Sequence, residues 1–132
     1  QLPQRFPARQ HFQAYAAIHR LHRLPEECAI FVQQSPAAID AGVFHNDVIA
    51  MNTTRLMIAH AEAFLHKDAL LEAIRRAPGQ DAFHYHEISS AELPVAEAVK
   101  SYFFNSQVLE LEDGRIVIVA PTESQENPYA HA

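Results

Sequence analysis

Several features that mark common protein classes are scarce or absent in this sequence of 132 residues. Its single cysteine, Cys28, excludes a disulfide within the chain and is typical of a reducing compartment such as the cytoplasm. No apolar run approaches the roughly 20 residues needed to cross a bilayer, and no stretch resembles a signal peptide. Ten lysines and arginines face sixteen aspartates and glutamates, and the net charge of -6 disfavours binding to nucleic-acid phosphates. We therefore expect no membrane and no nucleic acid among the partners of this chain.

The remaining composition is that of an ordinary globular protein. Hydrophobic residues make up 48% of the chain and charged residues 20%, which is enough apolar material for one buried core. We find no linker, low-complexity segment or internal repeat, so residues 1–132 are expected to belong to a single domain. The chain begins with Gln1 and not with methionine, which fits a fragment or a processed product.

Hydrophobic spacing and turn residues predict helices alternating with strands. Helices are expected at 9–24, 35–39 (a single turn), 68–77 and from 94 onward, and strands at 28–32, 48–51, 55–59, 83–88, 108–111 and 116–119. The last two strands should form a hairpin, because Asp113-Gly114 between them is a strong turn signal. This order of elements predicts a mixed α/β fold with some antiparallel pairing.

The most informative segment is Phe44-His45-Asn46-Asp47-Val48, where a histidine precedes an aspartate by two residues. In a strand, side chains alternate between faces, so His45 and Asp47 would point to the same side. An imidazole beside a fixed negative charge can transfer protons near neutral pH and can bind a cationic substrate. Taken alone the pattern is weak, and a purely structural histidine bonded to Asp47 or to the backbone is the alternative.

Four segments give this pattern a family context. They are residues 5–10, 39–50, 99–107 and 125–127, which read RFPARQ, IDAGVFHNDVIA, VKSYFFNSQ and QEN. Together they resemble the N-succinylarginine dihydrolases of the guanidine-modifying superfamily, over nearly the whole chain. The resemblance implies an internal part of a single catalytic domain with the pentein fold, an α/β propeller of five ββαβ modules. This chain would hold about two modules and could not close the ring alone, so apolar faces and strand edges should be exposed.

The resemblance also implies an activity, namely hydrolysis of N2-succinylarginine to N2-succinylornithine, two ammonia and carbon dioxide in arginine catabolism. The superfamily attacks the guanidinium carbon with a cysteine thiolate, so no metal or organic cofactor is expected. The matching cysteine would lie beyond Ala132 and the catalytic glutamate before Gln1. Cys28 matches no family motif and lies in an apolar run, so it is not assigned as the nucleophile. We expect a small-molecule substrate, a cytoplasmic location and a homodimer of the full-length enzyme.

Three residues match the family's functional positions. His45 would be the general acid that protonates departing ammonia and then the base that activates water. Asp47 would accept two N–H groups of the substrate guanidinium, because a carboxylate matches that planar fork. Arg9, in Pro7-Ala8-Arg9, would bind a substrate carboxylate. Each residue also has an ordinary reading, as a structural histidine, a turn aspartate or a solvated arginine at a helix start.

Other functions stay open at this point. Arginine or agmatine deimination is the nearest enzymatic rival, and a non-catalytic structural or guanidine-binding module is another alternative. A histidine-rich metal site is the third, because His84 and His86 share a strand face and His19 and His22 lie one helical turn apart. No further ligand at a recognised spacing completes either pair, so no metal site is predicted.

Overall fold

In the computed structural model, residues 2–9, 11–77, 79 and 82–132 are described. The helices are α1 (Phe12–Leu21), α2 (Pro36–Asp40), α3 (Lys67–Arg76), α4 (Val95–Ser101) and α5 (Thr122–Glu126). The strands are β1 (Ala50–Asn52), β2 (Leu56–His60), β3 (His84–Ile88), β4 (Gln107–Glu110) and β5 (Ile116–Val119). Short 3-10 helices cover Glu26–Cys28, Asn46–Val48 and Phe103–Asn105. The mixed α/β class predicted from the sequence is confirmed.

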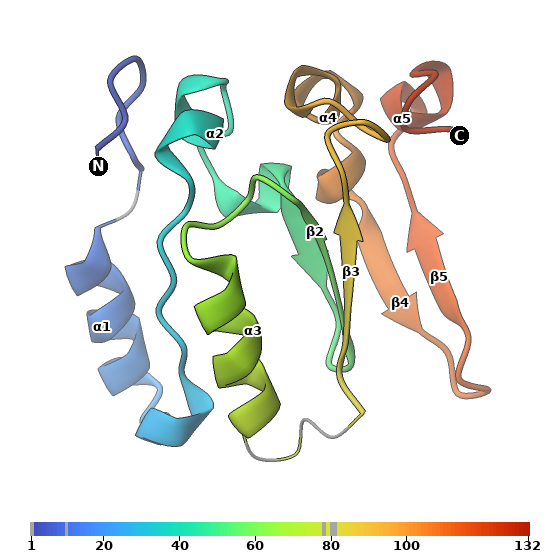
Figure 1. Cartoon of the computed structure of the whole chain (residues 1–132). Coiled ribbons are helices and arrows are strands. Elements are labelled where there is room, and N and C mark those ends of the chain that lie inside the picture. Colours follow the sequence, from blue (N-terminus) through green and yellow to red (C-terminus); the bar gives the residue numbers. More distant parts are fainter. Residues whose placement is uncertain (1, 10, 78, 80–81) are drawn as a thin grey trace.

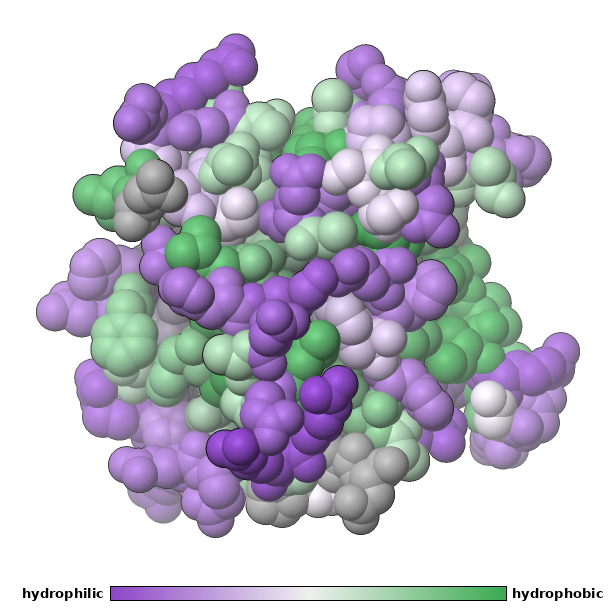
Figure 2. Space-filling view, in the orientation of Figure 1, coloured by the Kyte–Doolittle hydropathy of each residue, from purple (hydrophilic) through white to green (hydrophobic). Residues whose placement is uncertain are grey.

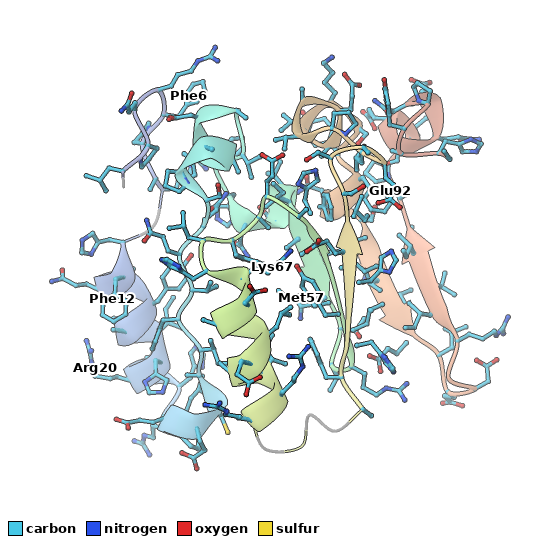
Figure 3. The ribbon with its side chains drawn as sticks, in the orientation of Figure 1. Phe6, Phe12, Arg20, Met57, Lys67 and Glu92 are labelled. Carbon is cyan, nitrogen blue, oxygen red and sulfur yellow. The ribbon has the colours of Figure 1, made fainter. Side chains whose placement is uncertain are left out.

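The strands form two small sheets that stand side by side, with α2, α4 and α5 at one end (Figure 1). β1 pairs antiparallel with β2, and β2 pairs parallel with β3. The parallel pair requires a crossover, which α3 supplies. Lys67, at the start of α3 (Figure 3), forms an ion pair with Glu87 on β3. β4 and β5 form a separate antiparallel hairpin, as the Asp113-Gly114 turn predicted. Neither sheet closes on itself among the described residues.

The buried side chains lie on both faces of the β1–β2 pair. Ala50 and Ala59 are cross-strand partners and belong to a cluster around Val43 and Ile49. Met51 and Ile58, the next pair, belong to a second cluster around Phe104. Successive strand residues point to opposite faces, so this short hairpin is the wall between two halves of the core.

His60 is a fully buried polar residue at the end of β2, at 0% exposure. Its Nε2 lies 2.8 Å from the carbonyl oxygen of Leu93, and its Nδ1 accepts the backbone N–H of Glu62 at 3.0 Å. An accepting Nδ1 carries no proton, so the imidazole is the neutral tautomer with the proton on Nε2, donated to Leu93. The ring thus ties β2 to the segment before α4.

The largest differences from the sequence-predicted elements lie in the first third of the chain. The first helix begins at Phe12 and not at Arg9, because His11 is in extended conformation and caps the helix by accepting the N–H of Gln13. The strand predicted at 28–32 is wrong. Cys28 ends a 3-10 helix and is exposed, and Ile30, Phe31 and Val32 join no named strand. The apolar side chains of this run line a pocket instead of a sheet.

Helix α1 and strand β5 expose much apolar surface. α1 contains no buried residue, and all four residues of β5 are exposed, from 37% at Val117 to 55% at Val119. Figure 2 shows a hydrophobic patch at the side of the molecule where β5 lies in Figure 1. Exposed apolar patches of this kind mark surfaces that meet other protein segments.

Candidate functional site

The segment that carries His45 and Asp47 is a turn and not a strand that would place both side chains on one face by alternation. His45 is extended (φ -142, ψ 149) and precedes the 3-10 helix Asn46–Val48, while β1 begins only at Ala50. The chain turns here because Val48 and Ile49, at 6% and 0% exposure, enter the core. The turn still brings the two side chains together, with His45 Nδ1 2.8 Å from Asp47 Oδ1.

This contact has a definite chemical meaning. A protonated His45 forms an ion pair with Asp47, so the carboxylate stabilises the charged imidazole. The side chains are 32% and 59% exposed, so solvent screens the pair but substrate can reach it. One carboxylate oxygen of Asp47 lies against His45, and a guanidinium bound by Asp47 would share the carboxylate with the imidazole.

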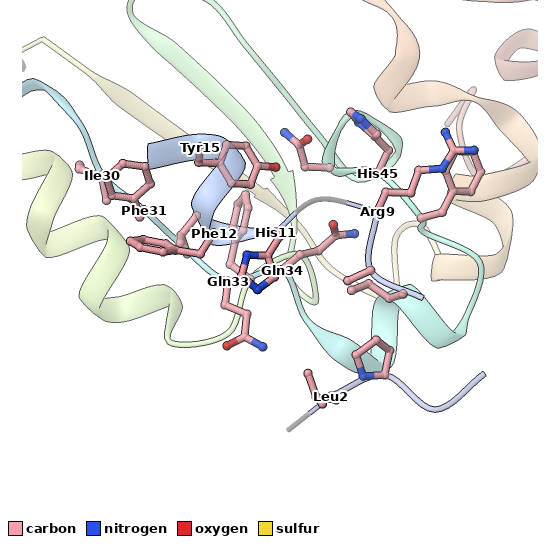
Figure 4. A pocket seen from close by; sticks show the side chains of 17 residues that line it. Leu2, Arg9, His11, Phe12, Tyr15, Ile30, Phe31, Gln33, Gln34 and His45 are labelled. Atoms are coloured by element: carbon pink, nitrogen blue, oxygen red, sulfur yellow. The ribbon is translucent and has the colours of Figure 1, made fainter. Parts of the chain in front are cut away.

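His45 and Arg9 line the same pocket, whose volume is about 600 Å³. Pockets of roughly 300–1,000 Å³ are typical of small-molecule sites. In Figure 4, His45 and Arg9 lie toward one end of the pocket and Phe12, Phe31 and Ile30 toward the other. The pocket therefore combines a polar end with an apolar end. Asp47 does not line the pocket, but it contacts His45, which does.

Arg9 is held against an aromatic ring within this pocket. Its guanidinium carbon lies 4.9 Å from the centroid of the Phe44 ring. Phe44 also lines the pocket and directly precedes His45. A cation over an aromatic face is attracted by the quadrupole of the ring, which restricts where the long arginine side chain can lie.

Several pocket residues carried no signal in the sequence. Tyr15, Gln33 and Gln34 come from α1 and the extended segment after it, and they meet only because these segments fold together. Gln34 Nε2 donates to the carbonyl oxygen of Val43 at 2.8 Å, which ties the pocket wall to the loop before His45. A pair of glutamines outside any periodic pattern could not have been assigned to a site in advance.

The histidine pairs do not assemble a metal site. The described residues contain no group of three or more histidine, cysteine, aspartate or glutamate side chains that could hold a metal ion. His84 and His86 lie exposed on β3, and His19 packs edge-on against Phe31 with ring centroids 5.9 Å apart. Cys28, also exposed, is not among the residues that line the pocket with His45.

Comparison with known proteins assigns the chain to a family. A family model described as succinylarginine dihydrolase matches residues 1–132. The chain belongs to the succinylarginine dihydrolase family. The resemblance inferred from the four sequence segments is thus confirmed. None of the helices in the described part of the chain has the length and apolar character needed to cross a membrane.

Similar curated proteins carry the family's name. Three proteins named N-succinylarginine dihydrolase are similar to this chain. They come from Shewanella halifaxensis (46% identical), Shewanella piezotolerans (48%) and Aeromonas hydrophila (47%). Each match extends over 130 residues, which is 98% of this chain and 29% of the relative. This succinylarginine dihydrolase family member therefore spans less than a third of the length of these relatives.

Proposed function

We propose that this chain is part of an enzyme that hydrolyses N2-succinylarginine to N2-succinylornithine, two ammonia and carbon dioxide. Relatives 44–48% identical to it are named N-succinylarginine dihydrolase. The observation that carries the proposal is the placement of His45 and Arg9 in one pocket, with Asp47 2.8 Å from His45. These side chains supply a proton carrier, a cation for a substrate carboxylate and an anion for a guanidinium.

In the proposed mechanism, a cysteine thiolate from a part of the enzyme outside this sequence attacks the guanidinium carbon. His45 donates a proton to the departing ammonia and then removes a proton from water, which attacks the same carbon and releases the thiolate. The ureido product of this first hydrolysis loses the second ammonia in the same way, and water then releases the thiolate to leave a carbamate. The bond between the carbamate carbon and the ornithine nitrogen breaks, which gives carbon dioxide and N2-succinylornithine. Asp47 stabilises the imidazolium that donates the first proton and the imidazolium that forms again when water is deprotonated, and its carboxylate accepts guanidinium N–H groups.

Arg9 would anchor the anionic part of the substrate. N2-succinylarginine carries two carboxylates, and an arginine fork binds a carboxylate through two parallel hydrogen bonds. Because Arg9 and His45 line the same pocket, a substrate held by its carboxylate can extend its guanidinium group toward the histidine. No cofactor is required by this scheme.

We also infer that the chain forms part of one pentein-type domain. The order β1, β2, α3, β3, with an antiparallel pair followed by a parallel one, corresponds to one ββαβ module. The exposed apolar surface of β5 is the kind of face that the next module of a ring would cover. Cytoplasmic location and a homodimer remain part of the same proposal.

The test is ammonia release by the full-length enzyme that contains this sequence. His45→Ala should lower kcat by roughly 10²–10⁴-fold, which is the usual contribution of a positioned general acid or base. His84→Ala is the matched control, because His84 is exposed on β3 and does not line the pocket. An unreduced kcat in His45→Ala would refute the assignment. One ammonia per substrate, instead of two, would support a deiminase-type reaction.

A further inference from the structure

The carboxylate of Asp40 accepts hydrogen bonds from the backbone of the segment that precedes Arg9. The N–H of Gln4 lies 3.0 and 2.9 Å from its two oxygens, and the N–H groups of Arg5 and Phe6 lie 2.6 and 3.2 Å from Oδ1. Three successive N–H groups thus donate to one side chain that is more than thirty positions away along the chain. Residues 2–9 contain no helix or strand, so this carboxylate is a main tie between the segment and the body of the domain.

Asp40 and His45 lie five positions apart on one short stretch of the chain. Asp40 is the last residue of α2, and the chain then runs through Val43 and Phe44 to His45. Val43 is fully buried, and its N–H donates to the carbonyl oxygen of Ala38 at 3.0 Å. The stretch that carries His45 is therefore anchored in the core on the side of Asp40.

Phe44 provides a second tie, at the side chain of Arg9 itself. Its ring centroid lies 4.9 Å from the guanidinium carbon of Arg9, and both residues line the pocket. Asp40 thus fixes the backbone before Arg9 through hydrogen bonds, and Phe44 contacts the guanidinium group of Arg9. Both ties start from the stretch that ends in His45.

We propose that Asp40 and Phe44 are positioning residues that fix Arg9 relative to His45, and thereby set the affinity for substrates that carry a carboxylate. Neither residue need touch the reacting atoms. The inference rests on the proposed function, because it gives Arg9 the role of substrate anchor. The N–H donors of Gln4 and Arg5 hold the pKa of Asp40 below its usual value, so the carboxylate is ionised wherever the enzyme works near neutral pH.

The experiment compares two variants of the full-length enzyme with two matched controls. Asp40→Asn keeps the shape of the side chain but removes its charge, and Phe44→Leu removes the ring. Asp113→Asn changes an exposed aspartate that pairs with Arg115 in the hairpin. Phe6→Leu removes a ring that lies 5.1 Å from the guanidinium carbon of Arg5, a residue that does not line the pocket.

The expected result is a change in KM without a change in kcat. Asp40→Asn and Phe44→Leu should each raise KM for N2-succinylarginine by about threefold to tenfold, the scale of one charge-assisted or cation–π contact at a partly exposed site. Both controls should stay within about twofold of wild type, because their partners, Arg5 and Arg115, do not line the pocket. In an Arg9→Met background, Asp40→Asn and Phe44→Leu should raise KM no further, because the group that they position is gone.

The proposal is overturned if the two variants lower kcat with KM unchanged, if they match their controls, or if their effects persist in full in Arg9→Met.

Trypsin cleavage after Arg5 gives a readout that does not depend on activity. Asp40→Asn should speed this cleavage relative to wild type and Asp113→Asn, because the backbone around Arg5 loses its tie. An equal rate overturns the role of Asp40 even if the wild-type enzyme proves inactive on N2-succinylarginine. Inactivity of the wild type would refute the proposed function instead.

Discussion

The close contact between His45 and Asp47 sets a measurable expectation for Asp47→Asn. Two unit charges 2.8 Å apart attract each other by about 1.5 kcal/mol in a fully aqueous dielectric, and salt lowers this to about 1 kcal/mol. The aqueous limit applies because the two side chains are 32% and 59% exposed. An energy of about 1 kcal/mol that stabilises the imidazolium corresponds to a roughly fivefold to tenfold change in rate.

We therefore expect Asp47→Asn to lower kcat for ammonia release by about fivefold to tenfold, against roughly 10²–10⁴-fold for His45→Ala. KM should rise as well, because the carboxylate is proposed to hold the substrate guanidinium too. The measurement is steady-state kinetics of the full-length enzyme at saturating N2-succinylarginine, for both single variants and for the double variant. Asp113→Asn is the control for a change of charge at an exposed aspartate.

The double variant decides whether the contact itself is responsible. Without His45 there is no imidazolium to stabilise, so adding Asp47→Asn to His45→Ala should leave kcat unchanged. The reasoning is refuted if Asp47→Asn still lowers kcat tenfold in that background, or if it alone costs as much as His45→Ala. Raising the salt concentration should shrink the kcat effect of Asp47→Asn, because exposed charges are screened.

Two further predictions concern stability. His60→Ala should lower the free energy of unfolding, measured by urea titration, by about 2–4 kcal/mol, because it creates a cavity and leaves the buried Leu93 carbonyl without its donor. His84→Ala, at an exposed site, is the control and should change this free energy very little. Glu110 accepts a hydrogen bond from the Thr53 hydroxyl, which lowers the pKa of the carboxyl below its ordinary value of 4.5. The ionised Glu110 carboxylate therefore stabilises the fold above about pH 4.5, and this stabilisation is lost as the pH falls through the lowered pKa. The urea midpoint of Glu110→Gln should accordingly fall less between pH 6 and pH 3 than that of wild type. An equal loss in both proteins would contradict this assignment.

The sequence predicted correctly those helices and strands that depend on residues close together along the chain. The hairpin of β4 and β5 follows from Asp113-Gly114, where Gly114 adopts the positive φ of +84° that the turn requires. The helix predicted at 68–77 is α3 with its bounds moved by one residue, since its apolar face has a clear helical period. Both elements are specified by residues within a few positions of each other.

The site was predictable only in part. His45, Asp47 and Arg9 were singled out by motif, and the structure brings His45 next to Asp47 and into one pocket with Arg9. The predicted reason for the first contact was wrong, because a 3-10 turn and not strand alternation joins the two side chains. Periodicity did not reveal that turn, since it results from the burial of Val48 and Ile49.

Long-range contacts explain what the sequence could not reveal. The ties from Asp40 to the backbone of Gln4, Arg5 and Phe6 join segments that are distant along the chain. An aspartate at the end of a short helix has no local pattern that distinguishes such a role from simple solvation. The strand predicted at 28–32 failed for a related reason, because its apolar residues are turned toward the pocket by α1 and not toward a sheet.

Helix α1 has a consequence for how this pocket can change over evolutionary time. It contributes Phe12 and Tyr15 to the pocket wall, yet no residue of α1 is buried in either core cluster. Substitutions there can reshape the cavity without creating voids in the packed interior, where the large losses of stability arise. Ile39 and Phe64 also line the pocket, but Ile39 is buried and Phe64 packs against a core cluster, so substitutions there would disturb the interior. Selection for a different ligand could therefore act most freely on the pocket residues of α1.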